Sequence, residues 1–399
     1  MQLLAAVLFM GLVITTLHLE VPLLLSIHIE LIFFLLVVGQ TAYGVFLQEK
    51  QKLSFSHPIV LPLLLVSLYA LAPLLSSFFS DQLWILQDGE YKSLVKILLL
   101  APCLYYLLIR PKNRDLLLNA IIFFYCVLGV YFLYRYFVLG EAREYDGRPL
   151  LSIRHGDPNF LCTFFAMMVP LALMQAWRAV IDKKNFQVFL HLVAALFLVI
   201  CAFVTQSRMG ILALLVGLGF LLTRRFSNSP KVAAVKVAAA VCFLAMVSAI
   251  ALEGSLAHRF SDINDKSSAD RLLTYENGFK VFAENPFFGS GMHKARDFFF
   301  ANSKYPHFQS EFKPLEVHNT YLNVLAELGV VGFVAFAAIL IWAWLAVWRS
   351  QNPERYFLIT SYFILAAASL TVGISYKDLV LLHLFVLAAL AQQKKDRAL

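Results

Sequence analysis

The chain has 399 residues, of which 60% are hydrophobic and only 15% are charged, and its mean hydropathy is +0.73. A water-soluble protein of this length could not bury so much apolar surface, so the composition excludes a soluble enzyme and indicates a protein surrounded by lipid. The net charge of +8 is then attributed to loops on one side of a membrane, and not to nucleic-acid binding.

Long apolar runs follow one another along the chain. Runs of about 20 residues predict membrane-spanning helices, because the strands of a membrane barrel alternate in polarity. We expect an all-α fold, a polytopic bundle of about twelve transmembrane helices, at residues 3–18, 21–47, 57–79, 91–109, 115–139, 158–180, 187–205, 209–223, 231–252, 319–348, 355–374 and 378–391. The first run has no basic region before it and no convincing cleavage site, so we interpret it as a retained helix.

The orientation follows from the Lys and Arg residues of the short connections. Alternate connections are rich in these residues, at 50–52, 110–114, 178–184, 224–231, 349–355 and 394–397, while the intervening turns are poor in them. Cytoplasmic loops of membrane proteins carry this excess. We therefore expect both termini in the cytoplasm.

Two longer segments then face the periplasm, at 140–157 and at 253–318. The second is too short for a confident independent domain, so the prediction divides the chain into helices 1–9 within 1–252, a periplasmic loop region at 253–318, and helices 10–12 with a cytoplasmic tail at 319–399. Within the loop region, "SADRLLTYENGFKVFAEN" predicts an amphipathic helix packed on the bundle, its apolar face formed by Leu272, Tyr275, Phe279 and Phe282.

Arg208 is the most informative arginine on the periplasmic side. It lies in "VTQSRMGILALL", with almost no loop between two apolar runs, and therefore near membrane level. An arginine at this depth requires an anionic partner, and its planar guanidinium suits phosphate oxygens. The alternative is that it extends to lipid headgroups or caps a helix.

Two further arginines are weaker candidates. "SIRHGDPNF" places Arg154 just before the sixth helix, where Asp157 and the following proline form an ordinary helix start that leaves Arg154 unexplained. Asn159 follows in the same motif, and Arg271 lies in the large loop region. Ordinary exposed loop arginines are the alternative for both.

His318 stands where the tenth helix is expected to begin. The partial positive charge of a helix N-terminus disfavours imidazolium, so we expect a neutral imidazole, the form that a general base requires. The next residue, Asn319, could cap the helix or bind a sugar hydroxyl. Asn319, Asn323 and Glu327 are spaced i, i+4, i+8 and form one polar stripe. Glu327 is either functional or a hydrogen-bonding partner between helices.

Other chemistries have no support in the sequence. It contains no Walker loop, no HExxH or GxSxG motif, no cysteine pair and no DxD-type carboxylate pair. The five cysteines lie in apolar segments without metal-ligand spacing. We therefore expect no metal and no cofactor.

Four motifs together resemble the O-antigen ligase family of bacterial membrane proteins, which also includes related polysaccharide polymerases and protein O-oligosaccharyltransferases. "HNTYLNVLAELGVVG" is similar to the family's His-Asn, nine residues, Gly pattern. "QSRMG" resembles its Ser-Arg-Gly turn, here with Met209 interposed. "DRLLTYENGFKVFAENPFFGSGM" resembles its Arg, amphipathic helix, Asn-Pro, Gly-x-Gly run. "RHGDPNFLCTFF" is similar to its Pro-Asn helix opening, with Asp157 where Asn is usual.

The resemblance implies a metal-independent, inverting glycosyl transfer on the periplasmic side of the bacterial inner membrane. The donor is a glycan on undecaprenyl pyrophosphate, and the acceptor of a ligase is a sugar hydroxyl of the lipid A–core in lipopolysaccharide biosynthesis. His318 would act as the base, with Arg154, Arg208 and Arg271 on the pyrophosphate and Asn159 and Asn319 as further contacts to substrate. Membrane lipids are the only other expected partners.

Two alternatives remain open from the sequence. A Wzy-type polymerase or a protein O-oligosaccharyltransferase would have the same fold and a different acceptor. A flippase or transporter of lipid-linked glycans would need a charged path across the bilayer, and the apolar runs contain few central charges: Glu327, Lys96 and Lys236. The polar candidates cluster at the periplasmic side, which favours an enzyme.

Overall fold

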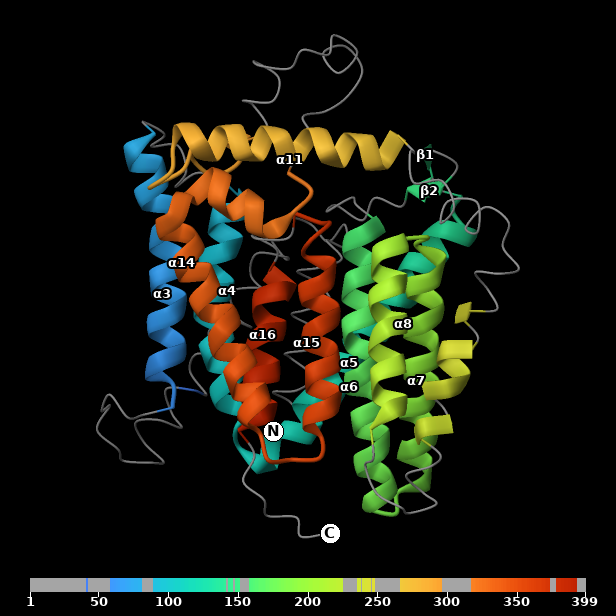
Figure 1. Cartoon of the computed structure of the whole chain (residues 1–399). Coiled ribbons are helices and arrows are strands. Elements are labelled where there is room, and N and C mark those ends of the chain that lie inside the picture. Colours follow the sequence, from blue (N-terminus) through green and yellow to red (C-terminus); the bar gives the residue numbers. More distant parts are fainter. Residues whose placement is uncertain are drawn as a thin grey trace.

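The computed structural model describes residues 41, 58–80, 89–140, 143–145, 148–150, 158–224, 235–237, 239–244, 246–247, 266–295, 317–373 and 378–392. Its helices lie side by side in one bundle, and α11 (Lys266–Glu284) crosses one end of it (Figure 1). We call this end of the bundle the α11 end and the other one the opposite end.

Apolar helices run along the bundle close to the expected positions: α3 (Val60–Phe79), α4 (Gly89–Leu108), α5 (Pro111–Phe137), α6 (Pro158–Ile181), α7 (Asn185–Val204), α8 (Arg208–Thr223), α14 (Thr320–Arg349), α15 (Arg355–Ala368) and α16 (Asp378–Ala391). The largest difference is at α15, which ends at Ala368 instead of residue 374, because the chain turns there to meet the start of α14.

Five of the described helices are long and apolar enough to cross a membrane: Val60–Phe79, Arg114–Phe137, Pro158–Ile181, Asn185–Val204 and Thr320–Arg349. The expected spans at 3–18 and 21–47 lie outside the described residues, apart from Thr41, and the span at 231–252 is helical where it is described. The helical bundle of a multi-pass membrane protein is thus confirmed, and the total of twelve spans stays a prediction.

Helix α6 forms the centre of the bundle, because all of its residues from Pro158 to Val180 are buried. The outer helices are instead apolar on both faces. In α3, for example, a stripe at helical spacing is exposed, formed by Leu61, Leu64, Leu68, Leu71 and Leu75. An exposed leucine stripe of this length suits contact with lipid acyl chains.

The all-α helix bundle is confirmed, and one short hairpin accompanies it. Strands β1 (Arg143–Tyr145) and β2 (Arg148–Leu150) pair antiparallel, with Arg143 opposite Leu150. The sequence between them is Asp-Gly, the dipeptide that favours a two-residue hairpin turn. The hairpin lies within the connection expected at 140–157.

The amphipathic helix is confirmed as α11, which packs against α14, but its predicted apolar face is wrong. Leu272 and Phe279 are 68% and 62% exposed. The packed face carries Thr274, Asn277 and Gly278, which are buried. A Cβ on Gly278 would lie 2.9 Å from Leu322 Cγ, and Val281 on the same face is fully buried in a hydrophobic cluster with Val317 and Leu322. Close approach, hydrogen bonding and this apolar side chain together decide which face packs.

A buried ion-pair cluster joins three helices at the opposite end. Arg178 of α6, which is 3% exposed, forms a bidentate pair with Glu354, in which Nε donates to Oε1 at 2.8 Å. Its Nη1 donates to Asp115 Oδ1, also at 2.8 Å. The two carboxylates compensate the positive charge of the buried guanidinium, whereas burying that charge alone would cost much free energy. The cluster therefore fixes α5, α6 and the start of α15 to one another.

Candidate active site

His318 and Asn319 begin α14 at the α11 end. Asn319 is the N-cap, with extended backbone (φ −152°, ψ 115°), and its side-chain oxygen accepts a hydrogen bond from Leu322 N at 3.0 Å. The prediction that Asn319 could cap the helix is confirmed, and this bond satisfies a helix-end N–H that has no partner within the helix. His318 lies just outside the cap, at the helix terminus, and is half-buried.

The backbone of His318 is held by α11. The Tyr275 phenol lies 3.1 Å from the His318 carbonyl oxygen and 2.9 Å from that of Leu370. A phenol has one hydrogen, so it is shared between the two carbonyls. The Thr274 hydroxyl oxygen lies 3.5 Å from His318 N. Three segments that are far apart in the sequence therefore meet at His318.

Arg271 lies one turn before Tyr275 on the same helix and is half-buried. Its carbonyl oxygen accepts a hydrogen bond of 2.9 Å from the Thr274 hydroxyl. Burial raises the pKa of the Tyr275 phenol above its ordinary value, and the nearby positive charge of Arg271 lowers it in part. The phenol thus stays protonated at neutral pH, and Arg271 and the His318 backbone are both neighbours of it.

A second cluster contains Arg208 and Asn159. Arg208 is the first residue of α8, whose N-cap is Ser207. The Ser207 hydroxyl donates to Asn159 Oδ1 at 2.7 Å and accepts from Gly210 N at 3.4 Å. Asn159 is 4% exposed, so the structure places it as a bridge between the starts of α6 and α8. Arg208 itself is half-buried and lies directly beside this bridge.

Close packing fixes the position of Arg208. Gln206 has a positive φ of 52°, a conformation that reverses the chain between α7 and α8 in a few residues. A Cβ on Gly210 would lie 2.4 Å from Cys162 Sγ, so α8 approaches α6 at its first turn. The tight turn and the small residue hold Arg208 at the end of the bundle, as the sequence predicted from the absence of a loop.

Both clusters lie at the α11 end. Helices α6 and α8 begin at the same end because α7 connects them in an antiparallel hairpin, and α14 begins beneath α11 (Figure 1). Helix α15 packs against α8 and α14, and its end contacts the start of α14, where Thr320 N donates to Ser369 O at 2.8 Å. Arg154, the remaining arginine candidate, lies outside the described residues.

A break in α14 explains why the His-Asn motif ends in a glycine. Gly329 has φ 65° and ψ −167°, a conformation that is essentially restricted to glycine. The turn at 285–291 packs into this break: Ser290 N donates to Ala326 O and Gly291 N to Glu327 O, both at 3.0 Å, and Val330 N donates to Pro286 O at 2.9 Å. The turn therefore satisfies backbone groups that the broken helix leaves open.

We call the contact between the turn at 285–291 and the break in α14 the joint. It explains the spacing of the His-Asn motif and of the Asn-Pro, Gly-x-Gly run. A Cβ on Gly289 would lie 2.3 Å from the Glu327 carbonyl carbon, and one on Gly329 would lie 2.3 Å from Phe287 O. Only glycine fits at position 289 of the turn and at position 329 of the helix. The Asn-Pro, Gly-x-Gly run is thus a turn, as predicted, and it is bound to the helix that carries His318.

Glu327 lies at the same joint. Its side chain is 3% exposed, its Oε2 lies 3.4 Å from Asn323 Nδ2, and its carbonyl oxygen accepts from the Ser76 hydroxyl of α3 at 2.6 Å. The polar stripe is confirmed for Asn323 and Glu327, which are both buried. Asn319 departs from it, because its side chain is used in the cap.

Residues 193–337 match the family model of O-Antigen ligase, Wzy_C. This segment, a little over a third of the chain, is similar to the O-antigen ligase family. A search of curated proteins found no match. The family resemblance inferred from the motifs is confirmed by the match, whose range includes Arg208, Arg271, His318 and the joint at Gly329. Arg154 and Asn159 lie before the matched range.

The arrangement brings two kinds of chemical group to one end of the bundle. A half-buried imidazole can accept a proton, and guanidinium groups bind anionic oxygens. The sequence did not identify Tyr275 or Ser207 as contributors. Ser207 could have been predicted as a helix cap, because a serine stands directly before an apolar run. Nothing in the sequence distinguishes Tyr275 from any other tyrosine on an amphipathic helix.

Proposed function

We propose that the protein is an O-antigen ligase, a glycosyltransferase that moves a polysaccharide from undecaprenyl pyrophosphate to a sugar hydroxyl of lipid A–core. The observation that carries the proposal is the placement of His318 and Arg271 around one tyrosine, within the family domain and at the end of a membrane bundle. A lipid-borne donor presents its pyrophosphate at this level of a bilayer, where protein and water meet.

In the proposed mechanism, His318 removes the proton from the acceptor hydroxyl as that oxygen attacks the anomeric carbon of the donor sugar. The bond from this carbon to the pyrophosphate oxygen breaks on the opposite face, so the configuration inverts. Arg208 and Arg271, with Arg154, bind the pyrophosphate and stabilise the charge that develops on it. The proton stays on His318 until solvent removes it. The pyrophosphate leaving group supplies the driving force, so no nucleotide is needed.

The proposal includes the placement of the protein. We infer twelve spans in the inner membrane, both termini in the cytoplasm and the α11 end in the periplasm, because Lys and Arg are concentrated in the connections that lie at the opposite end. The buried charges Arg178 and Glu354 also lie at that opposite end. The α11 end would then face the compartment in which both lipid-linked substrates are accessible.

The choice of acceptor is testable directly. The purified protein in lipid nanodiscs would receive an undecaprenyl-pyrophosphate-linked glycan, without nucleotide or added metal, and then either lipid A–core, a protein acceptor or no acceptor. Glycan on lipid A–core alone supports the proposal. Longer chains on the lipid carrier would show a polymerase, and glycan on the protein acceptor an oligosaccharyltransferase. No product in any mixture, alongside product from a known ligase, would overturn the enzyme assignment.

A further inference from the structure

The start of α14 and the end of α15 satisfy each other's backbone groups. Thr320, which follows the Asn319 cap, is fully buried. Its N donates to Ser369 O at 2.8 Å, and its hydroxyl donates to Val372 O at 2.6 Å. Helix ends leave N–H and C=O groups without partners inside the helix, and these groups are buried away from water, so each helix end depends on the other.

Two tyrosines bind the same end of α15. The Tyr321 hydroxyl donates to Ala366 O at 3.3 Å. Tyr275, which contacts the His318 carbonyl oxygen, also contacts Leu370 O at 2.9 Å. The acceptors on this side are main-chain carbonyls of the last turn of α15 and of the residues just after it. The chain at His318 and directly beyond it is thus tied to one short stretch of backbone.

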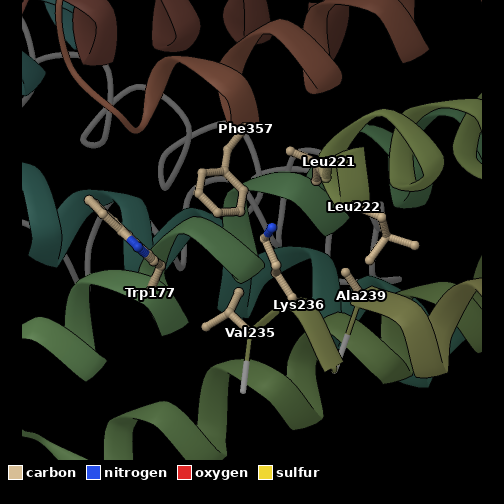
Figure 2. Close-up of a pocket in the computed structure, with 7 residues that line it drawn as sticks. All are labelled: Trp177, Leu221, Leu222, Val235, Lys236, Ala239 and Phe357. Carbon is tan, nitrogen blue, oxygen red and sulfur yellow. The ribbon is translucent and has the colours of Figure 1, made fainter. Parts of the chain in front are cut away.

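Helix α15 is itself fixed at its other end. Glu354, its N-cap, forms the buried pair with Arg178. Figure 2 shows Phe357 of this helix with Trp177 to one side and Leu221 to the other, and the ring centroids of Phe357 and Trp177 lie 6.4 Å apart. A helix of 14 residues that is held at both ends is a rigid reference from which the start of α14 is placed.

The position of the His318 backbone decides where its imidazole can reach. A histidine ring is joined to the main chain by only two rotatable bonds, so a shift of the helix start moves the ring with it. A general base must lie within about 2.6–3.2 Å of the atom whose proton it removes, and a misplacement of about 1 Å can lower a rate about 100-fold. A side chain that fixes the helix start can therefore affect the reaction without touching the substrate.

We propose that Thr320 is a positioning residue for His318, and that the end of α15 is the element against which it acts. The inference rests on the proposed function, because it requires His318 to be the base. The Asn319 cap already begins α14, so the Thr320 hydroxyl serves to place the helix and not to start it. Threonine suits this role because its β-branched side chain is stiff, so the hydroxyl keeps its direction toward Val372 O.

The test compares variants in the transfer of glycan from the lipid-linked donor to lipid A–core, in nanodiscs and below every thermal midpoint. Thr320→Val removes the hydroxyl and keeps the shape and the main-chain N–H. It should lower kcat at least about tenfold and leave the KM for the glycan donor unchanged, because Arg208 and Arg271 lie on other helices. Thr320→Ser keeps the hydroxyl and should stay within about twofold of the wild type.

Thr360→Val is the matched control. Thr360 lies on α15, is 1% exposed, and its hydroxyl donates to a main-chain carbonyl, Tyr356 O, at 2.8 Å. The control therefore loses a similar bond away from the end that receives α14, and its kcat should equal that of the wild type. Hydrogen exchange gives a second measurement that does not depend on activity. The amides at 320–323 should exchange faster in Thr320→Val and not in Thr360→Val.

Three results would each overturn this inference while the wild type still transfers glycan: equal kcat in Thr320→Val and Thr360→Val, a Thr320→Ser as slow as Thr320→Val, or unchanged exchange at 320–323. A wild type that transfers glycan to no acceptor would instead refute the proposed function, and the role of Thr320 with it. If Thr320→Val does not fold, Tyr321→Phe removes a different bond to the same end of α15. It should lower kcat at least about threefold, and an unchanged kcat would count against the inference in the same way.

Discussion

The joint between α14 and the turn at 285–291 predicts a large effect of Gly329→Ala. Alanine at φ 65° and ψ −167° adopts a sparsely populated conformation, which costs about 1–3 kcal/mol. Its Cβ would also lie 2.3 Å from Phe287 O and 2.6 Å from Gly289 N. The turn must therefore move away, which weakens the hydrogen bonds of Val330 N and Val331 N to it, each worth about 1 kcal/mol.

Together these terms predict that Gly329→Ala lowers the free energy of unfolding by at least about 3 kcal/mol. The measurement is the thermal midpoint in detergent, followed by loss of the monodisperse size-exclusion peak. Gly219→Ala is the matched control, because a Cβ there meets only Phe243 at 3.8 Å and alanine is the better helix former by about 1 kcal/mol. A midpoint for Gly329→Ala equal to that of Gly219→Ala would refute the reasoning about the joint.

Three further predictions concern hydrogen bonds and charges. Tyr275→Phe removes the hydroxyl that donates a hydrogen bond to the His318 and Leu370 carbonyls. It should lower kcat about tenfold, the equivalent of about 1.4 kcal/mol, and leave the KM for the glycan donor little changed. Tyr134→Phe, at an exposed tyrosine, should change neither. Arg208→Ala should lower the transfer rate at least about 100-fold with the folded protein retained, and near-normal transfer would remove this residue from the mechanism. Glu354→Gln leaves the buried Arg178 guanidinium poorly compensated and should lower the free energy of unfolding by about 3 kcal/mol, whereas Lys280→Gln, at an exposed pair, should change it by less than about 1 kcal/mol.

The positions of the helices were predictable because lipid imposes a simple rule. A membrane helix must be apolar for about 20 residues, and five of the described helices have that length of apolar sequence. Arg208 was predictable for the same reason, since two such spans left it no loop. The polar stripe also predicted Glu327, but not the contact of its carbonyl oxygen with Ser76.

The joints between elements were not predictable. Gly329 lies in an apolar run where a glycine is an ordinary small residue, and its positive φ depends on a turn about 40 residues earlier in the chain. The packed face of α11 was missed because Gly278 and Asn277 contribute through closeness and hydrogen bonding, which hydrophobic periodicity does not register. Asn159 could be placed at a helix start, but its partner Ser207 is 48 residues away.

The central claim is that His318 is the base of a glycosyl transfer at the α11 end, and its direct test is the transfer rate of His318→Ala. The substitution leaves the Asn319 cap and the carbonyl that faces Tyr275 in place, so the variant should fold with an unchanged thermal midpoint. We predict that it transfers glycan from the lipid-linked donor to lipid A–core at least about 100-fold more slowly than the wild type. A folded His318→Ala protein with a near-wild-type rate would contradict the account.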